Sequence, residues 1–167
     1  STKSDADKER SIAALANQNF RLALVMSIDR VSYNAQSVGD DLAANSLINS
    51  YIPGTFTSMA EAVTVEINGV PTEFAAGTFY GAIVQAQLDA DKIPLKVWNG
   101  ISSAGFDGWY SPENAKAFLA KAVAELAAEG VEISAEKPIH LDMPVRTDSQ
   151  VTMNQKQAVK QSVAAAT

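Results

Sequence analysis

The spacing of hydrophobic residues changes along the chain, and each spacing predicts a different element. Residues 20–30 carry a nearly continuous apolar run, which is typical of a central β-strand covered on both faces. Residues 62–74 alternate apolar and polar positions around Asn68-Gly69, the strongest short-range signal for a β-hairpin. We therefore expect a central strand at 20–30 and a hairpin at 62–74. Pro71 marks the second arm of the hairpin as a sheet edge.

Capping residues and helical spacing predict the helices. Ser111 is a natural N-cap before Pro112, and Gly130 stands where helices commonly end with a left-handed residue. Ser4, followed by acidic residues, predicts a short helix near the start of the chain. The other helices are expected at residues 40–52, 75–89, 112–129 and 153–166. The expected buried stripes are Ile12 and Leu15 in the first helix, and Phe118, Leu119, Val123 and Leu126 in the helix 112–129.

The remaining segments complete an alternation of strands and helices. Further strands are expected at residues 93–98, 131–133 and 139–146, and polar or Gly/Ser-rich loops at 33–40 and 99–110. This order predicts an α/β fold, with α+β as the alternative: a mixed sheet flanked by helices, with an inserted β-hairpin. The expected organisation is a helical arm (1–17), one α/β domain (18–150) and a C-terminal helical tail (151–167).

Composition narrows the chemistry. The 167 residues are 47% hydrophobic and contain no cysteine, which excludes disulfides, thiolate metal sites and a cysteine nucleophile. The net charge of −6 disfavours nucleic acid as a partner, because an acidic surface repels phosphate. No apolar run approaches the roughly 20 residues needed to span a bilayer. Residues 1–10 are polar and charged, so we expect no secretory signal there.

The candidate catalytic and metal-binding residues favour structural roles. His140, the single histidine, has Asp142 two residues on, and on a strand the two share a face. No nucleophile accompanies them, so we interpret His140 as a histidine at a surface or interface. The acidic pairs Asp40-Asp41 and Asp89/Asp91 lack the spaced oxygen ligands of a calcium loop, so solvated charge is the favoured interpretation. We expect no enzyme activity, cofactor or metal.

The loop at residues 99–110 lies where open α/β sheets bind ligands, after a predicted strand and before a helix. Its glycines, Gly100, Gly105 and Gly108, match neither a dinucleotide fingerprint nor a phosphate loop. The loop also carries the aromatic residues Phe106, Trp109 and Tyr110. A cluster of this kind favours a protein contact or a lid over the sheet edge more than a small-ligand platform.

The order of elements over residues 17–147 resembles the central part of contractile phage tail sheath proteins. The resemblance is carried by the strand after an Asn-rich start (17–27), the small-residue helix (75–89), Lys92-Ile-Pro-Leu-Lys-Val-Trp-Asn-Gly-Ile, the helix closing on Leu126-Ala-Ala-Glu-Gly-Val, and Arg146-Thr147. It implies a structural protein without an active site, located in the virion and, during assembly, in the host cytoplasm. The implied partners are copies of itself and a tail tube protein.

Two functional hypotheses follow. The first is a self-assembling subunit or domain of a tail sheath. Its interface would use Val63, Val65 and Ile67 of the edge hairpin together with Phe106, Trp109 and Tyr110, since exposed strand edges and aromatic residues both favour association. The alternative is a ligand-binding or hydrolase-like α/β domain that uses the loop at 99–110.

Overall fold

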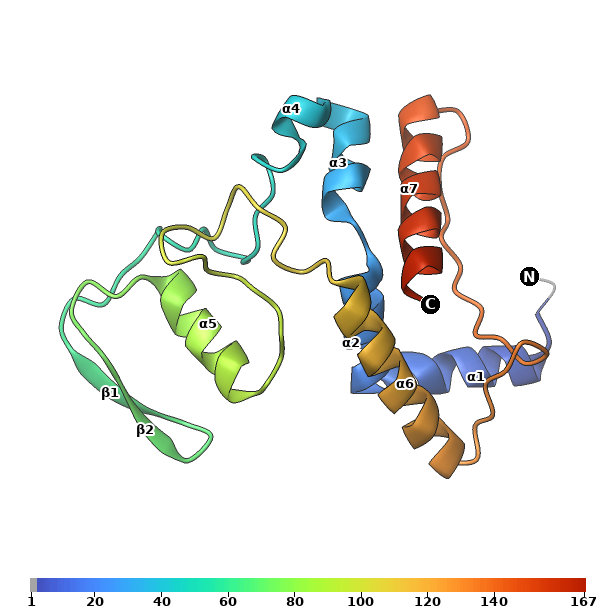
Figure 1. Cartoon of the computed structure of the whole chain (residues 1–167), viewed down its shortest axis with the longest axis horizontal. Coiled ribbons are helices and arrows are strands. Elements are labelled where there is room, and N and C mark those ends of the chain that lie inside the picture. Colours follow the sequence, from blue (N-terminus) through green and yellow to red (C-terminus); the bar gives the residue numbers. More distant parts are fainter. Residues whose placement is uncertain (1–2) are drawn as a thin grey trace. The chain divides into compact units, whose positions relative to one another are not determined.

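The computed structural model describes residues 3–167 and confirms the mixed α/β or α+β class: helices accompany a two-stranded antiparallel sheet (Figure 1). In chain order the elements are α1 (Asp5–Ala16), α2 (Gln18–Ser27), α3 (Arg30–Val38), α4 (Asp40–Ala43), β1 (Val63–Ile67), β2 (Val70–Phe74), α5 (Tyr80–Ala90), α6 (Pro112–Ala128) and α7 (Gln150–Ala166). The chain forms two compact units. Unit 1 runs through Asp29 and resumes over Tyr110–Thr167, and unit 2 is Arg30–Trp109.

The expected central strand at residues 20–30 is instead helix α2, so that prediction is wrong. Asn17 caps the helix, because its side chain accepts a hydrogen bond from the backbone N–H of Phe20 at 2.9 Å. Phe20, Ala23 and Met26 are buried, and their three-residue spacing lies on one helical face. A continuous apolar run that is covered on most sides is compatible with either element, and the cap decides in favour of the helix.

Unit 1 packs its core where α1, α2 and α6 meet. Ala14, Phe20, Ala122 and Leu126 form the buried cluster. Ile12 and Leu15, expected as the buried stripe of α1, are exposed; the buried residues of α1 are instead the small ones, Ser11 and Ala14. Ala14 joins the cluster shared with α2 and α6, where a small side chain allows helix axes to approach closely, and Ser11 accepts a hydrogen bond from the N–H of His140.

A carboxylate on α6 fixes the junction between α1 and α2. Asn17 and Asn19 each donate a side-chain hydrogen bond of 2.8 Å to Glu125. These bonds favour the charged form and hold the pKa of Glu125 below its usual value. The α6 cap itself is as expected: Ser111 accepts from the N–H of Asn114, Pro112 occupies the first turn, and Gly130 has a positive φ of 83°.

The first helix begins with a reciprocal capping box that yields a pH prediction. Ser4 donates to the Asp7 carboxylate at 2.7 Å and accepts from the Asp7 N–H, and Arg10 adds a 2.8 Å bond. The Ser4 hydroxyl, assisted by Arg10, lowers the pKa of Asp7 from 3.8 to about 2. The stabilisation is therefore complete above pH about 4 and is lost as pH falls through about 2. NMR titration of the Asp7 carboxyl carbon should give a midpoint near 2, and Ser4→Ala should raise it. A midpoint near 3.8 in the unmodified chain would contradict the capping geometry.

Unit 2 contains the hairpin, which is confirmed. Strands β1 and β2 pair antiparallel with Ile67 opposite Val70. Asn68 and Gly69 form the turn with φ angles of 50° and 78°, the positive values that such a turn requires. Asn68 also donates a 2.8 Å hydrogen bond to Asp91, just beyond α5. The hairpin is therefore held against the end of α5.

Three other expectations for unit 2 are corrected. Residues 33–40 lie largely in helix α3, and the helix expected at 40–52 is confined to α4. Residues 93–98 form no strand. Their backbone is bound by a side chain instead: Gln85 of α5 accepts hydrogen bonds from the N–H groups of Val97 (2.8 Å) and Trp98 (3.3 Å). A side chain that takes these donors satisfies them without a partner strand.

Residues 131–133 and 139–146, expected as strands, are paired with no other segment of the described chain. The helix expected at 153–166 is present as the longer α7, because Ser149 provides an N-cap that accepts from the N–H of Thr152. Along α6 the deeply buried positions are Ala115, Ala122 and Leu126. Phe118, Leu119 and Val123 of the expected stripe are half-buried.

Candidate ligand-binding loops

Two loops of unit 2, residues 48–56 and 99–109, are joined along their backbones. Ser103 makes most of the connections: its carbonyl accepts from the N–H of Asn49 at 2.8 Å, and its hydroxyl accepts from the N–H of Gly54 at 2.6 Å. The N–H of Gly105 donates to the carbonyl of Leu47 at 3.0 Å. These bonds tie the predicted loop at 99–110 to a second loop that precedes the hairpin.

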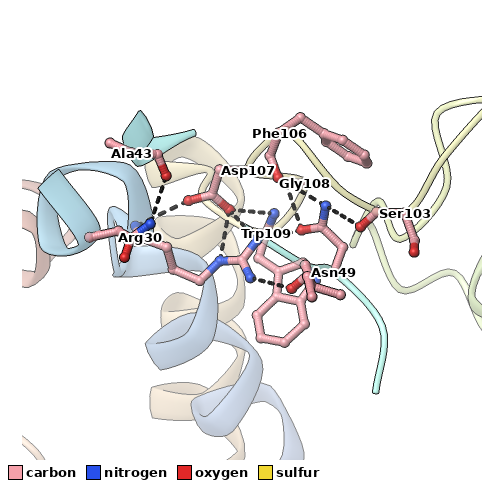
Figure 2. A network of polar contacts seen from close by, with 10 residues as sticks. Arg30, Ala43, Asn49, Ser103, Phe106, Asp107, Gly108 and Trp109 are labelled. Carbon is pink, nitrogen blue, oxygen red and sulfur yellow. Dashed lines mark hydrogen bonds and ion pairs between the residues drawn. The ribbon is translucent and has the colours of Figure 1, made fainter. Parts of the chain in front are cut away.

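Asn49 is the buried centre of this connection (Figure 2). Its side-chain amide donates to the carbonyls of Ser103 (3.1 Å) and Phe106 (2.9 Å), and its oxygen accepts from the N–H of Gly108 (3.2 Å) and from Arg30. Every donor and acceptor site of the amide is thus engaged. A fully satisfied buried amide of this kind holds a loop in one conformation.

An ion pair anchors the end of the same loop. Arg30, at the start of α3, donates to the Asp107 carboxylate through Nε (3.0 Å) and Nη2 (2.8 Å), and its backbone N–H donates at 3.1 Å. The two side chains are only 17% and 8% exposed. The guanidinium lies 4.1 Å from the centre of the Trp109 ring; both side chains are drawn in Figure 2. Desolvated charges in this geometry are strongly coupled, so Arg30 and Asp107 act as one unit.

Close backbone approaches complete the support of the loops. A Cβ added at Gly108 would lie 1.8 Å from the carbonyl oxygen of Lys96. The two segments are held at this distance because the Lys96 N–H donates a hydrogen bond to the Gly108 carbonyl. A Cβ at Gly81 would lie 2.3 Å from the Trp98 ring. Trp98 in turn lies 6.0 Å from Phe79, centroid to centroid. The loops therefore rest on a closely packed base.

Large apolar side chains on the two loops are exposed. Tyr51 is fully exposed, Ile101 is 80% exposed and Phe56 is 75% exposed. Where exposed large apolar side chains gather on one surface, they usually mark a site that another molecule contacts. The loop at 48–56 was not predicted from the sequence. Its signal was the sequence Tyr-Ile-Pro-Gly-Thr-Phe, in which aromatic residues flank a turn.

The expected interface residues have different environments. Val65 is exposed and Val63 is half-buried, but Ile67 is buried within unit 2. Phe106 and Trp109 are half-buried at the base of the loops. Tyr110, also half-buried, belongs to unit 1. The six residues therefore do not form one exposed surface within either unit.

The other candidate groups have structural partners. Asp142 forms an ion pair with Lys3 at 2.7 Å, and the N–H of His140 donates to Ser11. Asp91 accepts from Asn68 and Gln87, which lowers its pKa. Residues 3–167 contain no group of three or more His, Cys, Asp or Glu side chains placed to hold a metal ion. Within the same range, no helix is both long and apolar enough to cross a bilayer.

The chain is similar in sequence to oligopeptide-binding proteins of streptococci. It is 35% identical over 164 residues to the oligopeptide-binding protein AliB of Streptococcus pneumoniae, covering 98% of this chain and 22% of AliB. It is 36% identical over 166 residues to AmiA of the same species, and 36% identical over 160 residues to SarA of Streptococcus gordonii, each also named an oligopeptide-binding protein. The chain spans about a fifth of the length of these relatives. No protein-family model matches it.

These similarities overturn the tail sheath interpretation. Relatives that match nearly the whole chain are oligopeptide-binding proteins, not tail sheath proteins. The expected assembly of copies around a tail tube, and the virion location, are wrong with it. The resemblance depended partly on a strand at 17–27, a range that the structure places in α2 and its cap. The relatives are named as binding proteins, which agrees at the level of the family with the expectation of a protein that is not an enzyme.

Proposed function

We propose that this chain is part of an oligopeptide-binding protein, and that the loops at residues 48–56 and 99–109 contribute to its peptide-binding surface. The proposal that the chain is part of such a protein is supported by its identity of 35% with AliB over 98% of the chain. The assignment of the two loops to the peptide-binding surface is supported by the exposed apolar side chains that they carry. It agrees with the ligand-binding alternative, which assigned a role to the loop at 99–110.

The physical properties of the loops suit an oligopeptide ligand. Tyr51, Phe56 and Ile101 offer apolar area to peptide side chains of varied shape, and aromatic rings do so with little loss of conformational entropy. Asn49, together with the ion pair of Arg30 and Asp107, holds the loops before a ligand arrives. Preorganisation of this kind lowers the entropic cost of binding. The ligand is bound and released without covalent change.

A segment exchange makes this function measurable. In the exchange protein, the segment of AliB that matches this chain is replaced by residues 1–167. We expect Tyr51→Ser and Phe56→Ser each to weaken its binding of a mixture of short oligopeptides by about tenfold, which corresponds to about 1.4 kcal/mol. Isothermal titration calorimetry gives the affinities, and circular dichroism checks that the variants fold.

The matched control is Leu42→Ser, which removes another exposed apolar side chain of unit 2, on α4. It should leave the affinity unchanged. If the loop variants bind as tightly as the exchange protein itself, the assignment of the loops is wrong. A loss of binding in the Leu42 variant of equal size would have the same consequence.

A further inference from the structure

Unit 1 contains an apolar groove that residues 3–167 leave open. It has a volume of about 720 Å³ and is lined by Leu24 and Ile28 near α2, Val159 and Val163 of α7, and Leu141 and Met143 of the preceding segment. A second pocket of about 310 Å³ shares Leu24, Leu141 and Val163 with it. Leu141 and Met143 are both 43% exposed. Apolar surface that is continuous across two helices and an extended segment usually has an occupant.

The extended segment has the pattern of a strand. No turn, bend or helix interrupts residues 138–146, and in Figure 1 this stretch runs on between α6 and α7 without coiling. Ile139, Leu141, Met143 and Val145 are apolar, while His140, Asp142 and Arg146 are polar. Alternation with a period of two is typical of a strand with one face buried. Three members of the apolar set, Ile139, Leu141 and Met143, line the groove or its neighbouring pocket, and the polar residue Asp142 also borders the groove.

The two backbone edges of this segment differ. In an extended chain, alternate residues direct their N–H and C=O groups to opposite edges. The even-numbered edge is occupied at His140, whose N–H donates to Ser11 and whose carbonyl accepts from Lys3. The odd-numbered edge, at Leu141 and Met143, has no backbone hydrogen bond in the described chain. Pro144, which lacks an N–H, falls on the even-numbered edge, so the other edge keeps all its donors.

The extended segment forms one wall of the apolar groove and also carries the unpaired backbone edge. A single added β-strand can therefore pair with the edge and cover the groove. We propose that residues 139–146 pair with a β-strand from the remainder of a longer polypeptide, and that the apolar side chains of that strand cover the groove. Since the chain spans about a fifth of AliB, about four fifths of such a protein lies outside it. This inference rests on the proposed function, which places the chain within a longer binding protein.

The chemistry of the groove favours a permanent occupant over a ligand. A face built by two helices and an extended segment is the interior layer of a helix-covered sheet. A peptide ligand would leave this surface exposed each time it dissociated, at the cost of solubility. Lys156 and Lys160 border the groove together with Asp142, whose carboxylate is already paired with Lys3 at 2.7 Å. A strand flanked by carboxylates would therefore complement the groove in charge as well as in shape.

Hydrogen exchange measured by mass spectrometry tests the proposal. The amides of residues 139–146 are followed in the 167-residue chain, in the exchange protein and in AliB itself, each without added peptide. We expect fast exchange in the isolated chain. In the segment-exchange protein, and in the stretch of AliB that aligns with these residues, we expect the hydrogen exchange of these amides to be slower by about tenfold or more, as for a paired interior strand.

Each alternative occupant has its own signature. Protection in the isolated chain that increases with its concentration would identify a second copy as the occupant and overturn the proposal. Protection in AliB that requires added oligopeptide would identify a ligand and overturn it too. Fast exchange in AliB under all conditions would leave no strand at this edge. Because the prediction concerns proteins without peptide, its failure is distinguishable from a failure to bind peptides.

A matched pair of substitutions tests the contribution of the side chains. Leu141→Asp places a carboxylate in the groove, whereas His140→Asp places one on the opposite face. In the exchange protein we expect the first variant to lower Tm markedly more than the second, and in the isolated chain we expect the two to differ much less. Equal effects of the two variants in the exchange protein would contradict burial of the groove.

Discussion

Replacing Asp107 with alanine should lower the free energy of unfolding of unit 2 by about 3–5 kcal/mol. The substitution leaves the guanidinium of Arg30, which is only 17% exposed, without its carboxylate partner. It also removes the acceptor for the backbone N–H groups of Arg30 (3.1 Å) and Trp109 (3.0 Å). Burying an unpaired charge is among the most destabilising single changes in proteins. Urea denaturation, followed by the fluorescence of Trp109 and Trp98, measures the loss.

The control for Asp107 is Glu73→Ala, which removes an exposed carboxylate from β2 of the same unit. Its effect should stay within about 0.5 kcal/mol. Arg30→Ala should be less stable than wild type as well. The double variant that lacks both charges should be more stable than the sum of the two single effects implies, because the pair is coupled. Additive effects would show that the ion pair is not formed.

The second large effect is expected at Gly108. Alanine there would place a Cβ 1.8 Å from the carbonyl oxygen of Lys96, far inside the contact distance of the two atoms. Backbone must move, and the 2.7 Å hydrogen bond from the Lys96 N–H to the Gly108 carbonyl would be lost. We expect Gly108→Ala to cost about 3 kcal/mol, the upper end of the range for overpacking. Thermal unfolding should show a corresponding fall in Tm.

Gly100→Ala separates steric overlap from backbone strain. Gly100 has a positive φ of 97°, and a methyl group added there would meet no atom within 4 Å apart from its chain neighbours. Its substitution should therefore cost only the penalty of the left-handed backbone, about 1–2 kcal/mol. If Gly108→Ala is tolerated as well as Gly100→Ala, the close approach of residues 96 and 108 is not present in solution.

Local signals in the sequence were sufficient to predict an element where residues close in the chain determine its conformation. Asn68-Gly69 requires positive φ angles, and the hairpin follows. Ser111 and Pro112 define the start of α6, and Gly130 its end. In these cases the residues that determine the conformation lie within a few positions of one another. Periodicity alone was not sufficient at residues 20–30, because a helix covered on most sides and a central strand have similar apolar runs.

The candidate site could be predicted only in part. The loop at 99–110 was identified from its position after an apolar run and before a capped helix. Its partner loop was not, because the connection depends on Asn49 and Ser103, which are 54 residues apart. The role of Gln85, whose side chain replaces a partner strand for residues 97–98, is equally invisible in a local pattern. Contacts of this kind depend on the tertiary fold.

The tail sheath resemblance failed for a related reason. It compared the order of elements over residues 17–147, and that order contained a strand where the structure has α2. An order of strands and helices recurs in many unrelated proteins, so it carries little information about function. An identity of 35% over an alignment that covers 98% of the chain is a much more specific comparison, because it depends on the side chains themselves.

The central claim is tested most directly by oligopeptide binding of the exchange protein, in which residues 1–167 replace the matching segment of AliB. Calorimetric titration with a mixture of short oligopeptides is compared with the same titration of AliB. We expect the exchange protein to fold and to bind peptides with an affinity within about tenfold of that of AliB. A folded exchange protein that binds no oligopeptide would contradict the account.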